Sequence, residues 1–201
     1  MLKMAKNNEN QWCVVGTHPW RIDSERVSEW RSTFNAAFIE EHAVVGIGEI
    51  GLDYIFAKER ASQERQMVVL EDQIQVAQEF ELPLLLHCVR AHQDLLRCVK
   101  DFPFGGILHG FRSSYEIGME YVKRGFLLSL GAAINHEKAN KLKVVVQRIG
   151  LEHIVVESDA KSEATSTLDK SYQTLAQIFK LDIEALEGIT EKNLEKTFRL
   201  R

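Results

Sequence analysis

Short apolar runs alternate along the chain with longer segments in which apolar residues recur every three or four positions. The short runs predict buried β-strands, because a strand covered on both faces is apolar on both. They lie at residues 12–16, 43–47, 84–89, 107–111, 126–130 and 154–159. The periodic segments predict helices at 23–41, from a polar loop at 54–62 to about 81, and at 91–101, 114–124, 136–149, 168–180 and 182–198. This alternation predicts an α/β fold with a parallel sheet and right-handed crossovers.

Two helices carry clear apolar faces. The first is capped by Asp23 or Ser24, and the apolar face of that helix comprises Val27, Trp30, Phe34, Ala37 and Phe38. The long helix buries a face comprising Met67, Leu70, Ile74, Ala77 and Phe80. Both stripes have the helical period of a packed core, so we interpret them as structural.

Four predicted strands end in side chains that bind metal ions, namely Glu49, His87, His109 and Asp159. Each has an ordinary interpretation by itself: Glu49 as a solvated residue of a glycine-rich turn, and His87 as a hydrogen-bonded core histidine. Carboxyl ends of parallel strands meet at one edge, where sites are built. Imidazole and carboxylate are ligands of zinc and related divalent ions, so the pattern predicts a metal site.

Other polar residues stand close to these strand ends. His18 follows the first strand, where it could face a pocket or belong to a polar turn. Cys88 alternates with His87 along the strand, so we expect it to pack against a helix. Glu157 and Asp159 are two residues apart, and a strand there would direct both to one face.

Composition excludes some functions. The chain has 201 residues, 45% of them apolar, and a net charge of −4. It therefore lacks the overall positive charge of proteins that hold nucleic acid by neutralising phosphates. An enzyme could still bind the end of a nucleic-acid strand through local contacts. Three irregularly spaced cysteines indicate a reducing, cytosolic compartment. No run resembles a membrane span or a signal peptide.

Several stretches together resemble the signatures of the TatD family of metal-dependent hydrolases, many of which are deoxyribonucleases. These stretches are Gly16-Thr17-His18-Pro19, Gly48-Glu49-Ile50-Gly51-Leu52-Asp53, Leu82–His87, Leu108-His109-Gly110-Phe111, Glu157-Ser158-Asp159-Ala160, Gln66, Gln73, Thr190-x-x-Asn193 and Phe198. They occur in the family's order along essentially the whole chain. The resemblance implies an amidohydrolase-like TIM barrel.

The resemblance also implies a site. Its ligands to a divalent ion (Zn, Mg or Mn) would be Glu49, His87, His109 and Asp159. Asp159 and Glu49 would be the catalytic carboxylates, and Asp159 would take a proton from metal-bound water.

Three further residues acquire roles from the same resemblance. Glu157 would hold an imidazole tautomer, with a plain strand-end acid as the alternative. His18 and Arg90 would line the substrate side, although a solvated residue at a helix start is the simpler interpretation of Arg90.

The sequence departs from the family pattern at several points. Relatives open with a strand that carries His-x-His, and no such pair occurs here. We therefore expect residues 1–201 to form a single TatD-like domain, truncated at its N-terminus, with about six of the eight barrel strands. Val89 replaces an arginine, Lys161 replaces a proline, and the usual loop is missing from residues 161–171. An upstream start codon, a partner or second copy covering the open edge, or a degenerate member would each account for this.

The leading functional hypothesis is a TatD-type hydrolase that cleaves phosphodiester bonds, with DNA as substrate, in the cytoplasm and without a membrane. The missing histidine pair predicts weak occupancy by one metal ion and reduced nuclease activity. A non-catalytic binding or scaffold relative is one alternative. A hydrolase of a small-molecule ester or amide is another, because one fold hosts many chemistries.

Overall fold

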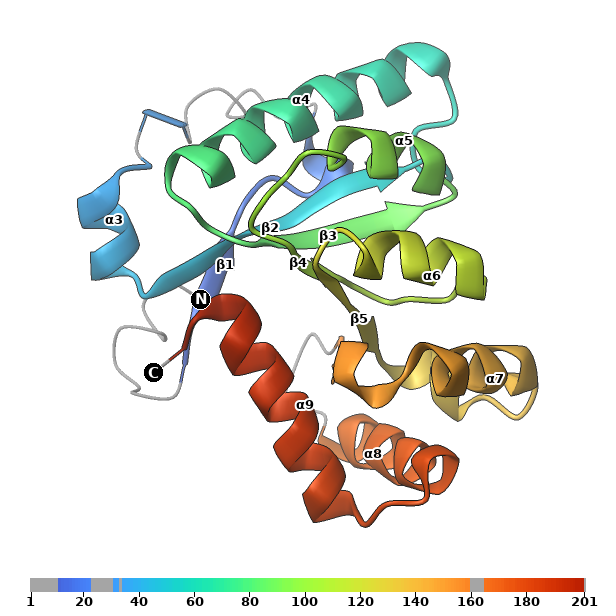
Figure 1. Ribbon diagram of the computed structural model, residues 1–201. Helices are drawn as coiled ribbons and strands as arrows, with labels where there is room; N and C mark the ends of the chain where they lie inside the picture. The colour runs from blue at the N-terminus through green and yellow to red at the C-terminus, as the bar shows by residue number, and fades with distance from the viewer. Residues whose placement is uncertain (1–10, 23–30, 33, 160–164, 201) are drawn as a thin grey trace. The chain divides into compact units, whose positions relative to one another are not determined.

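The computed structural model describes residues 11–22, 31, 32, 34–159 and 165–200 (Figure 1). Its strands follow the predicted order in one sheet, β1-β2-β3-β4-β5-β6. They are β1 (Cys13–Val15), β2 (Val44–Asp53), β3 (Leu84–Val89), β4 (Gly106–Leu108), β5 (Phe126–Leu130) and β6 (Ile154–Val156). The strand pairs β1/β2, β2/β3 and β5/β6 are parallel, which confirms the predicted α/β class.

Helices separate these strands as the periodicity predicts. Within the described residues, the α-helices are α3 (Ala36–Glu41), α4 (Arg60–Glu79), α5 (His92–Cys98), α6 (Tyr115–Val122), α7 (Asn140–Ile149), α8 (Thr165–Phe179) and α9 (Ile183–Phe198). The same residues include the short 3₁₀ turns η1 (Pro19–Arg21), η2 (Ala132–Asn135) and η3 (Leu151–His153).

The helix predicted over 23–41 is interrupted at Phe34 and Asn35, although its last residues, Ala36–Glu41, are helical as predicted. Asn35 has an extended backbone and caps α3 by accepting a hydrogen bond from the Phe38 amide (3.0 Å), so a new helix begins there. Phe34, just before the cap, is buried as predicted and packs edge-on against Phe80. Residues 23–30, including both proposed caps, lie outside the described part.

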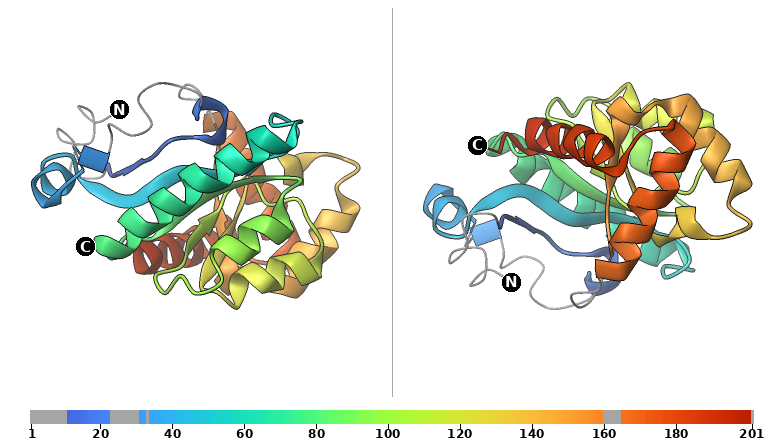
Figure 2. Two further views of the ribbon diagram at one scale, coloured as in Figure 1. Left: turned by 90° about the horizontal axis from the view of Figure 1, so that it is seen from above. Right: turned by 90° about the horizontal axis from the view of Figure 1, so that it is seen from below.

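Residues 1–106 form a compact unit. Helix α4 lies along β2, as Figure 1 and both views of Figure 2 show. Leu84 and Leu86 of β3 are fully buried, and so is the predicted face of α4 at Leu70, Ile74 and Ala77. Met67 and Phe80 at its margins are half-buried. The same helix also buries glutamines, which a purely apolar stripe does not predict.

Residues 107–201 form the second compact unit. Within it α6 packs on β5 and α9 on β6, while α8 and α9 lie side by side (Figures 1 and 2). Asn193 of α9 donates to the carbonyls of Leu151 (2.9 Å) and Ile154 (2.8 Å), and so fixes the start of β6. Whether the whole chain is one domain, as the sequence predicts, stays a prediction.

Among the helices of the described residues, none has the length and apolarity needed to cross a bilayer. All three cysteines are free thiols, as their spacing predicts. Cys88 lies 3.2 Å from the Nδ1 atom of His92 on α5, which confirms that it faces a helix.

Candidate metal centre

Glu49 sits on an irregularity of β2. Gly48 pairs with Leu85 of β3 and Ile50 pairs with Leu86, so Glu49 is an extra residue without a partner in the register. An extra residue of this kind bends a strand and redirects a side chain. The strand itself continues to Asp53, beyond the predicted strand end at residue 47.

The glycines around Glu49 allow β2 and β3 to approach closely. A Cβ atom on Gly51, where φ is +147°, would lie 1.9 Å from the His87 carbonyl oxygen. One on Gly48 would lie 2.5 Å from the Leu85 Cβ atom. These contacts exclude any side chain, so the glycines bring Glu49 next to His87.

His87 lies between two carboxylates. Its Nδ1 atom is 2.8 Å from Glu49 Oε1, and its Nε2 atom is 3.2 Å from Asp53 Oδ2. A neutral imidazole donates from only one nitrogen. If Nε2 donates to Asp53, the Nδ1 lone pair and a Glu49 oxygen face each other, an arrangement that a shared proton or a cation stabilises.

The loop carrying His18 is held by two buried glutamines of α4. Gln73 pairs with the backbone of Thr17, accepting from its amide (2.5 Å) and donating to its carbonyl (3.3 Å). Gln66 donates to the Pro19 carbonyl (3.1 Å). The loop therefore has a fixed path over β2, and the His18 Nε2 atom lies 3.4 Å from Glu49 Oε1.

His18, Glu49 and His87 each offer one donor atom, and these atoms lie within 4.8 Å of one another. Donor atoms around a tetrahedral zinc ion lie about 3.3 Å apart, given zinc–ligand distances of about 2.0–2.1 Å. The distance of 3.4 Å between His18 and Glu49 fits this spacing. Two imidazoles and one carboxylate also form a donor set suited to zinc-like ions, so the residues present fit a divalent ion of this kind.

Asp53 lies next to His87 of this cluster and is only 3% exposed. Its Oδ2 atom accepts a hydrogen bond from Trp20 Nε1 (2.7 Å) as well as lying near His87. Burial alone raises the pKa of Asp53, but the hydrogen bonds from Trp20, from two backbone amides and from His87 outweigh it. The pKa of Asp53 therefore lies below its ordinary value, and its carboxylate is anionic at neutral pH.

A second cluster of imidazole and carboxylate side chains lies within residues 107–201. His109 directly follows β4, and its Nδ1 atom lies 2.7 Å from Glu157 Oε2. Glu157 also accepts hydrogen bonds from the Gly110 amide (3.1 Å) and the Ser129 hydroxyl. Asp159 is 73% exposed, and its Oδ2 atom is 3.9 Å from His109 Nε2. Glu157 thus fixes the His109 ring and leaves Nε2 directed toward Asp159.

One argument from the sequence was wrong. Strand β6 ends at Val156, and Asp159 has a left-handed backbone (φ 48°), so strand alternation does not govern Glu157 and Asp159. Arg90, between β3 and α5, is exposed, in line with the simpler interpretation. That His109 and Asp159 join Glu49 and His87 in one site stays a prediction.

Three residues have larger roles in the structure than their sequence context predicts. His18 was expected on the substrate side, whereas the geometry makes it a candidate ligand. Gln66 and Asp53 were noted only as residues that resemble the family, without a role. The available signal was a polar residue inside an apolar helix face, since a buried amide needs hydrogen-bond partners.

Comparisons with known proteins agree with these features. A family model described as "TatD related DNase" matches residues 1–199. The chain is 26% identical over 209 residues to the uncharacterized metal-dependent hydrolase YjjV of Escherichia coli K12, covering 100% of this chain and 80% of that protein. It is 30% identical over 218 residues to the 3′-5′ ssDNA/RNA exonuclease TatD of Escherichia fergusonii, covering 98% and 81%.

A solved structure has a similar fold. The crystal structure of YjjV, a TatD homologue from Escherichia coli K12, matches with a TM-score of 0.79 and 22% identity, covering 100% of this chain and 81% of that one. The family model covers nearly every residue, and the candidate metal centre lies within the matched range. This chain therefore belongs to the TatD-related DNase family of metal-dependent hydrolases.

Proposed function

We propose that this protein hydrolyses phosphodiester bonds of single-stranded DNA with the help of a divalent metal ion. The observation that carries the proposal is the cluster of His18, Glu49 and His87, whose donor atoms converge within 4.8 Å. The name of the relative from Escherichia fergusonii supports a single-stranded nucleic acid as substrate.

In this proposal His18, Glu49 and His87 hold the ion. Bound there, the ion supplies Lewis acidity that polarises a phosphoryl oxygen and acidifies water. The buried Asp53 orients His87 through its Nε2 atom, as carboxylates commonly do for ligand imidazoles. Two imidazoles favour zinc or manganese over magnesium, which prefers oxygen ligands.

In this proposal, residues of the second unit take part in proton transfer and in binding of the metal ion. Glu157 accepts from His109 Nδ1, which keeps the Nε2 lone pair available as a ligand or acceptor. Asp159 is exposed and carboxylate-bearing, so it can take a proton from an attacking water. As the resemblance implies, His109 and Asp159 are also ligands in this proposal.

The test uses single-stranded oligonucleotides labelled at either end, with zinc or manganese, and the variant Glu49→Gln. The amide keeps the size of the side chain but removes the anionic donor. We expect the wild type to shorten the oligonucleotide and EDTA to stop it. Glu49→Gln should lower the rate roughly 100-fold, the upper end of the typical effect of perturbing a metal site, and lower zinc binding measured by calorimetry.

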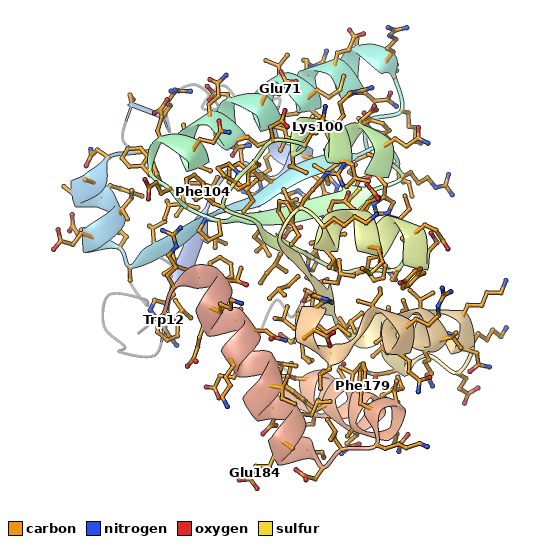
Figure 3. All side chains as sticks on the ribbon, viewed as in Figure 1. Trp12, Glu71, Lys100, Phe104, Phe179 and Glu184 are labelled. Atoms are coloured by element: carbon orange, nitrogen blue, oxygen red, sulfur yellow. The ribbon has the colours of Figure 1, made fainter. Side chains whose placement is uncertain are left out.

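The matched control is Glu71→Gln, which neutralises an exposed carboxylate on α4 in the same unit (Figure 3). It should leave both the rate and the zinc affinity unchanged. Cleavage that survives EDTA, or equal rates for wild type and Glu49→Gln, would overturn the proposal.

A further inference from the structure

Two exposed aromatic rings stand beside the candidate metal centre. Trp20 is 55% exposed and Phe56 is 53% exposed, and their rings stack with centroids 5.9 Å apart and planes 23° apart. Single apolar side chains on a surface are normal. A stacked pair with both rings open to solvent is different, because it presents a flat aromatic surface.

The position of Trp20 is fixed by polar contacts that leave its ring exposed. The indole Nε1 donates to the buried Asp53 carboxylate (2.7 Å). Its ring makes T-shaped contacts with His18 and His87, with ring centroids 4.9 Å and 6.2 Å apart. Asp53 therefore holds both the Trp20 ring and a candidate metal ligand, and the aromatic surface begins one ring away from the cluster.

The fixed geometry makes Trp20 a prearranged contact, not a side chain that must be ordered on binding. Phe56 is positioned by its own backbone, since its amide donates to Asp53 Oδ1 (3.0 Å). Asp53 thus anchors both members of the pair. The same carboxylate lies 3.2 Å from His87 Nε2, so it links the aromatic pair to the candidate metal centre.

We propose that Trp20 and Phe56 form a stacking surface for an unpaired nucleobase of the substrate. The proposal rests on the function proposed above and adds how the polymer is held. Every nucleobase has a planar face that stacks on aromatic side chains, a sequence-tolerant contact common in proteins that bind single strands.

Two cations occur on backbone segments adjacent to the rings. Lys58 follows Phe56 by two residues. Arg90 directly follows Val89 of β3, whose carbonyl accepts a hydrogen bond from the amide of Tyr54, two residues before Phe56. Both cations are exposed. Basic side chains next to aromatic ones can contact the phosphates that flank a stacked base. A paired base is hidden in a duplex, so the surface selects single strands.

The test compares binding of two ten-residue oligonucleotides, one of thymidine and one of abasic tetrahydrofuran residues, by fluorescence anisotropy in EDTA so that no cleavage occurs. Phe56→Ala should weaken binding of the thymidine oligonucleotide about 10-fold, given typical stacking contributions, and leave binding of the abasic one unchanged. Phe56→Trp should restore the affinity.

Ile55→Ala is the matched control, because Ile55 is 51% exposed on the same loop but carries no ring. It should leave binding unchanged. In a chain whose other two tryptophans are replaced by phenylalanine, the thymidine oligonucleotide should quench Trp20 fluorescence and the abasic one should not.

Failure of this inference is distinguishable from failure of the proposed function. Equal loss of affinity for both oligonucleotides, or none for either, would overturn the stacking surface even if Glu49→Gln abolishes cleavage. A loss specific to thymidine would support the surface even if the protein cleaves no DNA.

Discussion

Replacing Gln66 by leucine tests whether α4 holds the candidate site in place. Gln66 is 1% exposed, accepts from the Asp53 amide (2.8 Å) and donates to the Pro19 carbonyl (3.1 Å). Leucine has similar size but no polar atoms. The variant therefore leaves one buried donor and one buried acceptor without partners, on the two segments that carry His18 and Asp53.

The magnitude follows from those two groups. A buried polar group without a partner costs about 1–3 kcal/mol, so two cost about 2–5 kcal/mol, with part of the upper range offset by the apolar side chain. For a chain of this size, we expect the melting temperature to fall by about 5–15 °C. Because His18 and Asp53 loosen together, zinc affinity should fall roughly 10-fold.

The assays are thermal unfolding followed by circular dichroism and zinc titration by calorimetry. Gln78→Leu is the matched control, since Gln78 is exposed on the same helix; it should change stability by less than about 0.5 kcal/mol. If Gln66→Leu melts within about 1 °C of the wild type, the argument that α4 organises the site through its buried amides is wrong.

Two other predictions concern stability. Burial raises the pKa of Tyr54, and so do the hydrogen bond to Asp94 and the negative charge of Asp94. Because an unfolded tyrosine ionises near pH 10 and the folded Tyr54 stays protonated there, the folded state loses stability above about pH 10. Urea unfolding at pH 8 and pH 11 should show that Tyr54→Phe abolishes this loss. A stability difference between wild type and Tyr54→Phe that is equal at both pH values would contradict the prediction. Gly51→Ala should cost at least about 3 kcal/mol, since its Cβ would overlap the His87 carbonyl, whereas Gly188→Ala in α9, with nothing within 4 Å, should gain roughly 1 kcal/mol. Similar melting temperatures for the two glycine variants would refute the close approach of β2 and β3.

Local pattern alone predicted much of the fold. Strands β3 and β5 begin and end at the predicted residues, because apolar runs bounded by Pro83, Gly125 and Gly131 leave little freedom in their limits. The glycines of β2 stand out in the sequence, and the structure shows why they are there, since no other residue tolerates a backbone so near. The positions of His87 and His109 close to strand ends were likewise visible in the order of residue types, whereas Glu49, predicted at a strand end, lies within β2.

The tertiary structure decided what those side chains contact. Glu49 reaches His87 because an extra residue shifts the register of β2 against β3, and no local periodicity encodes a register. Gln66 and Gln73 bind loops 47 and 56 residues away in sequence. Such partners are chosen by the need to satisfy buried polar groups once the core has formed, so they emerge only when α4 is packed against the sheet.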